Sequence, residues 1–131
     1  MSIEAALYLA LDDVLRPALA AMSPPCGYYD HAPPDADYPL VELARLDFAT
    51  NPEITLDQQV ASVTFSVWST ARGKKQTTEI LAKLRQVLHE QAPALDTGRA
   101  VICLHDRSNV QLDSDGLTYM GQAAFTITVS P

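Results

Sequence analysis

Alternation of apolar and polar residues is the clearest pattern in the chain. Across residues 117–129 the odd positions are apolar except for one glycine, whereas the even positions are mostly polar. Residues 59–69 alternate in the same way and place Phe65 on the apolar side. A period of two predicts strands of a sheet that buries one face. Phe125 and Ile127, on the apolar side of the last strand, are therefore expected in the core.

Two other segments repeat their apolar residues every three or four positions, which is the spacing of an amphipathic helix. The first follows Ser2, a residue type that caps helix N-termini, and is expected to end near residue 21 with a kink at Pro17. The second covers residues 76–91 and is ended by Pro93. The two apolar stripes are Ile3, Leu7, Leu11, Val14 and Ala18, and Ile80, Leu84, Val87 and Leu88.

Shorter apolar runs complete the predicted sheet. Residues 40–46 predict a strand, and residues 101–104 predict a buried strand that resumes at residues 109–112 after a bulge. The Asp-Gly pair within residues 113–116 predicts a hairpin turn, because such turns require a positive φ.

Two polar segments are expected to be connections. Residues 27–39 are rich in proline and suit an ordered loop with a short strand at Tyr28 and Tyr29, and residues 47–57 contain Asn51-Pro52. Hairpin-like links dominate, so we expect an α+β fold in a single domain of residues 1–131. Four or five mostly antiparallel strands would form its sheet, with two helices packed on one face.

The chain is acidic, with a formal net charge of −7. It therefore lacks the basic footprint of nucleic-acid binding, and it is not suited to anionic membranes. No run approaches the roughly 18 apolar residues of a membrane span, and the N-terminus lacks the basic start of a signal peptide. We expect a protein that folds in a cytoplasm and does not bind membranes.

No segment has the spacing of a catalytic or metal-binding motif. Asp30-His31 and His105-Asp106 each join an imidazole to a carboxylate, but adjacent residues of an extended chain point opposite ways. Cys26 and Cys103 stand outside any metal-ligand spacing. We therefore expect a protein that is not an enzyme and holds no metal and no cofactor.

Two charged motifs have plain structural interpretations. Asp113-x-Asp115-Gly116 is similar to the start of a calcium loop, but position twelve is Ala124 instead of the closing Glu, so a turn is favoured. Arg72, Lys74 and Lys75, which we call the basic turn, precede a predicted helix. They lack the glycine spacing of a phosphate-binding loop, so a solvated turn is favoured over a phosphate contact.

The chain resembles the phage tail-completion, or tail-terminator, family. The resemblance rests first on Tyr29-Asp30-His31-Ala32-Pro33 and Tyr38-Pro39-Leu40-Val41, a region similar to the family's Y-D-H-x-P and P-Y-V pattern with one tyrosine and proline exchanged. The strand of residues 63–69 leading into the second helix also matches. So does an Asp-Gly turn before a long last strand that ends with residues 124–129.

This resemblance implies a structural subunit of the ring that ends the tail tube and joins tail to head in a long-tailed phage or phage-like particle, such as a gene transfer agent. It implies a homo-oligomer, a hexamer, whose partners are the tail tube protein and the head–tail connector protein. It implies no catalytic residues. The protein would be located in the tail of a particle assembled in a bacterial cytoplasm, and DNA would pass through its channel without specific binding.

Candidate assembly-interface residues come from one connection, one aromatic residue and the basic turn. Only the acidic segment 47–57 could serve as the long stacking arm that a tube subunit usually carries. Trp68 stands on the polar side of its strand, where it marks an interface or, as an equal alternative, packs under a loop. The candidates are Asp47, Asn51, Glu53, Asp57, Trp68, Arg72, Lys74 and Lys75.

The lining of such a channel is expected to be acidic or neutral, because basic side chains would hold DNA phosphates and slow their passage. The basic turn is expected to lie away from the channel. The acidic candidates for the lining are Glu42, Asp47, Glu53, Asp57, Asp113 and Asp115.

Two alternatives remain open. The first is another head–tail connector, head-completion or tail-tube component with a similar fold. The second is a small ligand-binding domain or an enzyme of unknown substrate, which requires a pocket with convergent polar groups.

Overall fold

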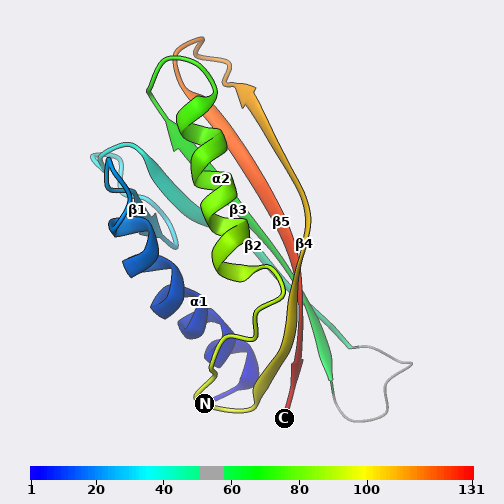
Figure 1. The fold of residues 1–131 in the computed structure, drawn as a ribbon. Coiled ribbons are helices and arrows are strands. Elements are labelled where there is room, and N and C mark those ends of the chain that lie inside the picture. The colour runs from blue at the N-terminus through cyan, green and yellow to red at the C-terminus, as the bar shows by residue number, and fades with distance from the viewer. Residues whose placement is uncertain (51–57) are drawn as a thin grey trace.

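The computed structural model of the chain describes residues 1–50 and 58–131. Within these ranges it contains two helices and five strands (Figure 1). In chain order they are α1 (Ile3–Ala20), β1 (Gly27–Tyr29), β2 (Leu40–Thr50), β3 (Gln59–Ser69), α2 (Lys75–Leu88), β4 (Arg99–Leu112) and β5 (Tyr119–Ser130). The predicted α+β class with a mostly antiparallel sheet is confirmed.

The described strands form one sheet in the order β1-β2-β3-β5-β4. The four long strands β2, β3, β5 and β4 are antiparallel to their neighbours. The short strand β1 is parallel to β2 and pairs with its first three residues, beginning with Gly27 opposite Leu40. The strands β3 and β5 therefore occupy the centre of the sheet, and β2 and β4 lie toward its two edges.

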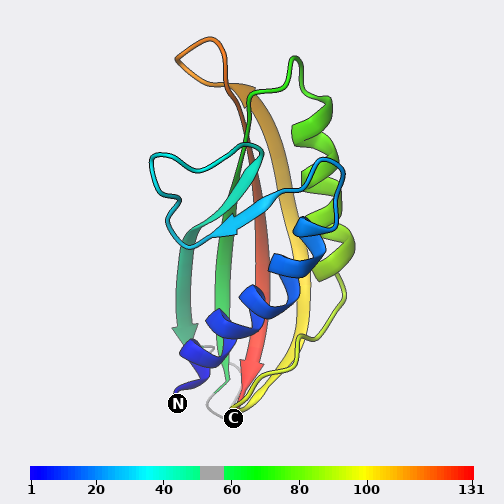
Figure 2. The same ribbon diagram turned by 90° about the vertical axis from the view of Figure 1, so that its left-hand side faces the viewer.

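The core lies on the apolar side of the alternating strands. Phe65 of β3 and Phe125 of β5 are at most 1% exposed, and their rings meet edge to face with centroids 5.8 Å apart. Ile127 is fully buried in the same cluster, as expected. Buried residues of α1 and α2 complete this cluster, and Figures 1 and 2 show both helices on the same side of the sheet.

The helix ends follow from local capping and from tertiary contacts. Ser2 caps α1, because its side chain accepts a hydrogen bond from the Ala5 amide at 3.1 Å. The helix α1 then continues through Pro17 to Ala20. The helix α2 ends at Leu88, three residues before the predicted end at residue 91, because Glu90 adopts a φ of 61° and its amide bonds to β4.

Two predicted strand boundaries are wrong. The strand β2 continues to Thr50, so residues 47–50 belong to the sheet and not to a connection, because β3 is long enough to pair with them. The strand β4 is continuous from Arg99 to Leu112, whereas two pieces were predicted. Register shifts at its two bulges let the pairing with β5 continue, and exposed polar residues obscured the strand in the sequence.

Replacing Phe125 by Ala removes a buried ring that contacts Phe65 and His105. The free energy of unfolding is expected to fall by about 3–5 kcal/mol. Chemical denaturation measures this loss, and Thr128→Ala on the opposite face, the matched control, is expected to cost less than about 1 kcal/mol. A loss at Phe125 as small as the control's would mean that the assigned register is wrong.

Candidate assembly surface

The face of the sheet that no helix covers, called the helix-free face below, is polar at its centre and carries the exposed apolar side chains of Ile102 and Leu104 on β4. Ser62 of β3 lies directly opposite Thr126 of β5, and the Thr126 hydroxyl donates to Asp106 Oδ2 at 2.7 Å. On β2 the guanidinium of Arg45 pairs with the carboxylate of Asp47. Small hydroxyl groups and locally paired charges make this face suited to water or to a polar channel.

One edge of the sheet is partly covered by β1. Since β1 pairs only with the first three residues of β2, no described strand pairs with the outer side of residues 43–50. Unpaired backbone groups on a strand edge form a ready template for another chain. The far part of β2 is therefore a candidate contact surface.

The other edge, formed by β4, is covered over its first half by the segment that follows α2. The backbone of Cys103 exchanges hydrogen bonds of 2.7 and 2.9 Å with residues 90–91. The backbone amide of His105 donates to His89 Nδ1 at 3.0 Å. In the part of the chain that the structure describes, nothing pairs with the outer side of residues 106–112.

The structure places the candidate interface residues at opposite ends of the strands. Asp47 lies opposite Ser62, whereas Trp68 lies at the other end of β3, opposite Leu40. The basic turn follows β3 at that second end, so it shares an end of the sheet with Trp68 and is separated from Asp47. The three candidates Asn51, Glu53 and Asp57 lie outside the described residues.

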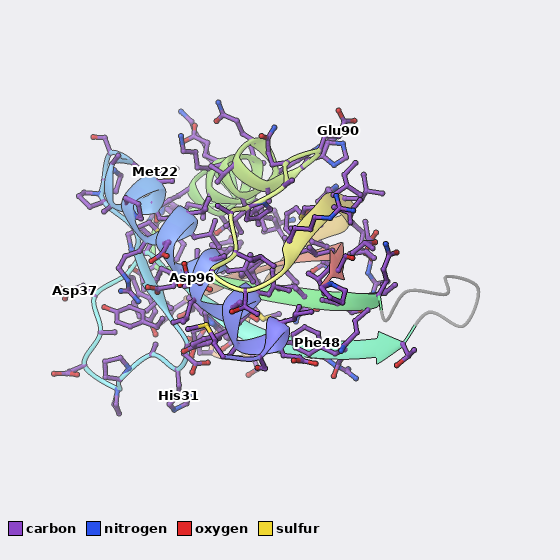
Figure 3. The ribbon with its side chains drawn as sticks, turned by 90° about the horizontal axis from the view of Figure 1, so that it is seen from below. Met22, His31, Asp37, Phe48, Glu90 and Asp96 are labelled. Atoms are coloured by element: carbon purple, nitrogen blue, oxygen red, sulfur yellow. The ribbon has the colours of Figure 1, made fainter. Side chains whose placement is uncertain are left out.

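Trp68 lines a cavity of about 290 Å³ beneath the loop that carries the Tyr-Asp-His motif. The Ala32 amide donates to Glu42 Oε2 at 2.8 Å and ties this loop to β2. The Trp68 Nε1 atom is buried and has no hydrogen-bond partner among the described residues. His31 is 94% exposed at the rim of this cavity (Figure 3), and its Nδ1 lies 3.8 Å from Glu42 Oε2, so the motif holds a loop against the sheet.

The basic turn is exposed at the start of α2. No ion pair of Arg72, Lys74 or Lys75 occurs within the described ranges. The cap residue Lys74 makes no side-chain hydrogen bond to the helix, and the first turn has no acidic residue. The three cations are thus available to an acidic partner.

In each adjacent Asp–His pair the carboxylate bonds to a residue outside the pair, and Asp30 Oδ2 accepts from the Tyr8 hydroxyl at 3.0 Å. His105 Nε2 lies 2.8 Å from Ser108 Oγ, whereas Asp106 accepts its bond from Thr126. Burial raises the pKa of both cysteine thiols to about 12, which makes them unreactive. Among the described residues, no group of three His, Cys, Asp or Glu side chains is placed to hold a metal ion.

Polar groups of the described residues thus gather on an open sheet face and at two unpaired strand edges. Unpaired strand edges of this kind can pair with strands of other chains. The chain belongs to a phage family: the family model described as tail completion protein gp17 matches residues 6–130. Membership supports a structural role in the tail of a phage or phage-like particle.

A comparison with solved structures gives the same fold. A chain from the structure titled "Virion of native gene transfer agent (GTA) particle" is similar, with a TM-score of 0.76 and 23% sequence identity. The similarity covers 99% of this chain and 96% of that chain. A comparison with curated protein sequences finds no match. Neither helix of the described ranges has the length and apolarity that crossing a membrane requires.

The pH dependence of stability tests the environment of His105. Burial, with Arg85 and His89 nearby, lowers the pKa of His105 below its ordinary value of 6.5. The unfolded chain then takes up a proton more readily than the folded one, so stability is expected to fall as pH drops through about 6.5. Urea denaturation at pH 7 and at pH 5 should show this loss, and His105→Gln should reduce it. An equal loss in the variant would contradict the assignment.

Proposed function

We propose that this protein is a subunit of the ring that terminates the tail tube and joins the tail to the head in a long-tailed phage or a phage-like particle such as a gene transfer agent. The observation that carries the proposal is the family match over residues 6–130, nearly the whole chain. The fold shared with a chain of a gene transfer agent virion over 99% of this chain supports it.

The surface of the protein supports ring formation on physical grounds. A closed ring of identical copies needs two different surfaces on each copy, one for each neighbour. The unpaired parts of β2 and β4 lie on opposite edges of the same sheet and provide two such surfaces. Their use in a ring gives every copy identical contacts and leaves no edge open.

The helix-free face suits the lining of a channel for DNA. Glu42 and Asp47 lie on this face of β2, and Arg45 pairs with Asp47 there. The turn between β4 and β5 carries two further acidic candidates, Asp113 and Asp115, and the Asp115 carboxylate accepts a hydrogen bond from the Thr118 hydroxyl at 2.7 Å. This turn lies beside the basic turn, because Gly116 and Leu117 line one pocket with Arg72. Arg45 and Arg107 also lie on this face, where the carboxylates of Asp47 and Asp106 offset their charge. A lining of hydroxyl groups with balanced charges lets DNA phosphates slide without being bound.

Negative-stain imaging of tails assembled with and without the protein tests the proposal. Tails that contain the protein are expected to end in a ring, to have a fixed length and to join heads. Tails without it should have an irregular head-proximal end. Protein found along the tube or at the head portal would contradict the proposal. Those outcomes would favour a tube or head-completion component.

DNA binding by the free protein provides a second test. With a net charge of −7 and no basic groove expected, the protein should not shift duplex DNA in a gel at low salt, where electrostatic binding is strongest. A control that gains cations on the helix-free face, Asp47→Lys with Ser62→Lys, should shift DNA more than the natural protein does. A clear shift by the natural protein would argue against passive passage.

A further inference from the structure

We propose that neighbouring copies join edge to edge into one continuous sheet. Residues 106–112 of β4 in one copy would pair antiparallel with residues 43–50 of β2 in the next. This inference rests on the proposed ring and names its subunit contact. The two segments are the parts of the long edge strands that no described strand covers, and they are nearly equal in length.

The strand directions fit this pairing. Each of the four long strands is antiparallel to its neighbour, so β2 and β4 run in opposite directions. Rotation about an axis roughly along the strands preserves these directions, so the β4 edge of one copy meets the β2 edge of the next in antiparallel orientation. Antiparallel pairs form the regular ladder that the remainder of the long-strand sheet already uses.

The backbone groups of β4 also point the right way. Cys103 and His105, opposite Ile127 and Phe125, direct their amides away from β5. Ser108 and Val110 lie opposite Ala123 and Gly121, which are odd-numbered residues of β5 like Ile127 and Phe125. Alternation therefore turns the amides of Ser108 and Val110 toward the open edge, where they can bond to a neighbouring strand.

The offset between the two free segments matches a closed ring. Asn109, at the middle of residues 106–112, shares a row of the sheet with Gln122, Ser66 and Glu42. Asp47, near the middle of residues 43–50, shares a row with Ser62, which precedes Ser66 by four residues in β3. This offset is about 13 Å along the strands, against about 19 Å across the four strand spacings to the next copy.

Such an offset corresponds to a strand tilt of about 35°, within the range that closed barrels require. A flat, untilted sheet would place the free part of β2 against the half of β4 that residues 90–91 already cover. In a hexamer about 24 long strands, four from each copy, would form a closed barrel. Its backbone diameter would be about 45 Å, which leaves room for a DNA duplex.

Side chains at the two edges are complementary. A groove of about 380 Å³ lies between α2 and β4 and is lined by Leu81, Ser108 and Val110 among others. When Asp47 of one copy lies opposite Asn109 of its neighbour, the next residue of β2, Phe48, lies opposite the neighbour's Ser108. Phe48 packs against its own core and stays partly exposed near the far end of β2 (Figure 3), so in this register the exposed part of its ring meets the neighbour's groove.

The charged residues on the other face agree with this register. Arg107 of β4 lies on the helix-free side and is exposed, and in the proposed register it is diagonal to Asp47 of the next copy. Opposite charges at diagonal positions of an antiparallel pair attract each other. The proposed contact thus has an aromatic residue, Phe48, on the helix-covered face and an ion pair between Arg107 and Asp47 on the helix-free face.

Disulfide trapping tests the contact. Asn109→Cys and Asp47→Cys place one thiol on each edge, and Gln86→Cys on the exposed side of α2, outside the groove, is the matched control. The native thiols are buried and should not react under mild oxidation. A mixture of N109C and D47C should give a covalent dimer, neither variant alone should do so, and the double variant should give a ladder that ends at the hexamer.

The outcomes separate this contact from the proposed function. If native mass spectrometry or imaging shows rings but N109C forms no disulfide with D47C or with the register alternative A49C, edge pairing is wrong and the ring stands. A dimer of N109C alone would indicate pairing of two β4 edges and would also overturn the contact. Absence of any oligomer, free or on tail ends, would overturn both.

A proline provides a second readout that does not depend on cysteine chemistry. Ser108→Pro removes an amide that points to the open edge, so the monomer should keep its circular dichroism spectrum, because edge positions tolerate proline. Assembly should be lost, while Ser108→Ala should still assemble. Unimpaired rings from a folded S108P variant would contradict the pairing.

Discussion

The antiparallel pairing of β3 with β5 holds the other elements in place, because both strands alternate in the same phase. One side of the pair is apolar, with Phe65 and Phe125 in contact at its centre, and both helices pack their buried residues into the same cluster. The other side is polar and carries Ser62 opposite Thr126. A shift of one residue in this register would move the apolar side chains of a strand to the polar face and its polar side chains into the core. The same pairing thus gives the protein its core and gives it a polar face for contact with water or DNA.

Sequence reasoning succeeded where the physical cause was local. The alternation that predicted a buried Phe125 and the Ser2 cap of α1 depend on residues close together in the chain. It failed at the ends of the edge strands. Residues 47–50 have a polar, connection-like sequence, yet they join β2 because β3 offers them partners. That information lies in a distant segment and leaves no pattern in residues 47–50 themselves.

The candidate surface was less predictable than the fold for the same reason. Asp47, Trp68 and the basic turn were grouped by residue type, but the order of the strands separates Asp47 from the others along the sheet. The free half of β4 could not be seen in the sequence, because it is defined by where residues 90–91 stop covering its edge. Free edges are a property of topology, and topology is set by pairings between distant segments.

Together these features describe a subunit whose sheet is complete at its centre and incomplete at its edges. Hydrogen exchange at single amides tests this account most directly, because exchange reports which backbone groups are bonded. In the free subunit the amides of Ser108 and Val110 should exchange rapidly. In the assembled ring they should become protected together with those amides of residues 43–50 that point away from β3, while the amide of Cys103 should be protected in both states. A ring that forms without added protection at Ser108 and Val110 would contradict the continuous sheet.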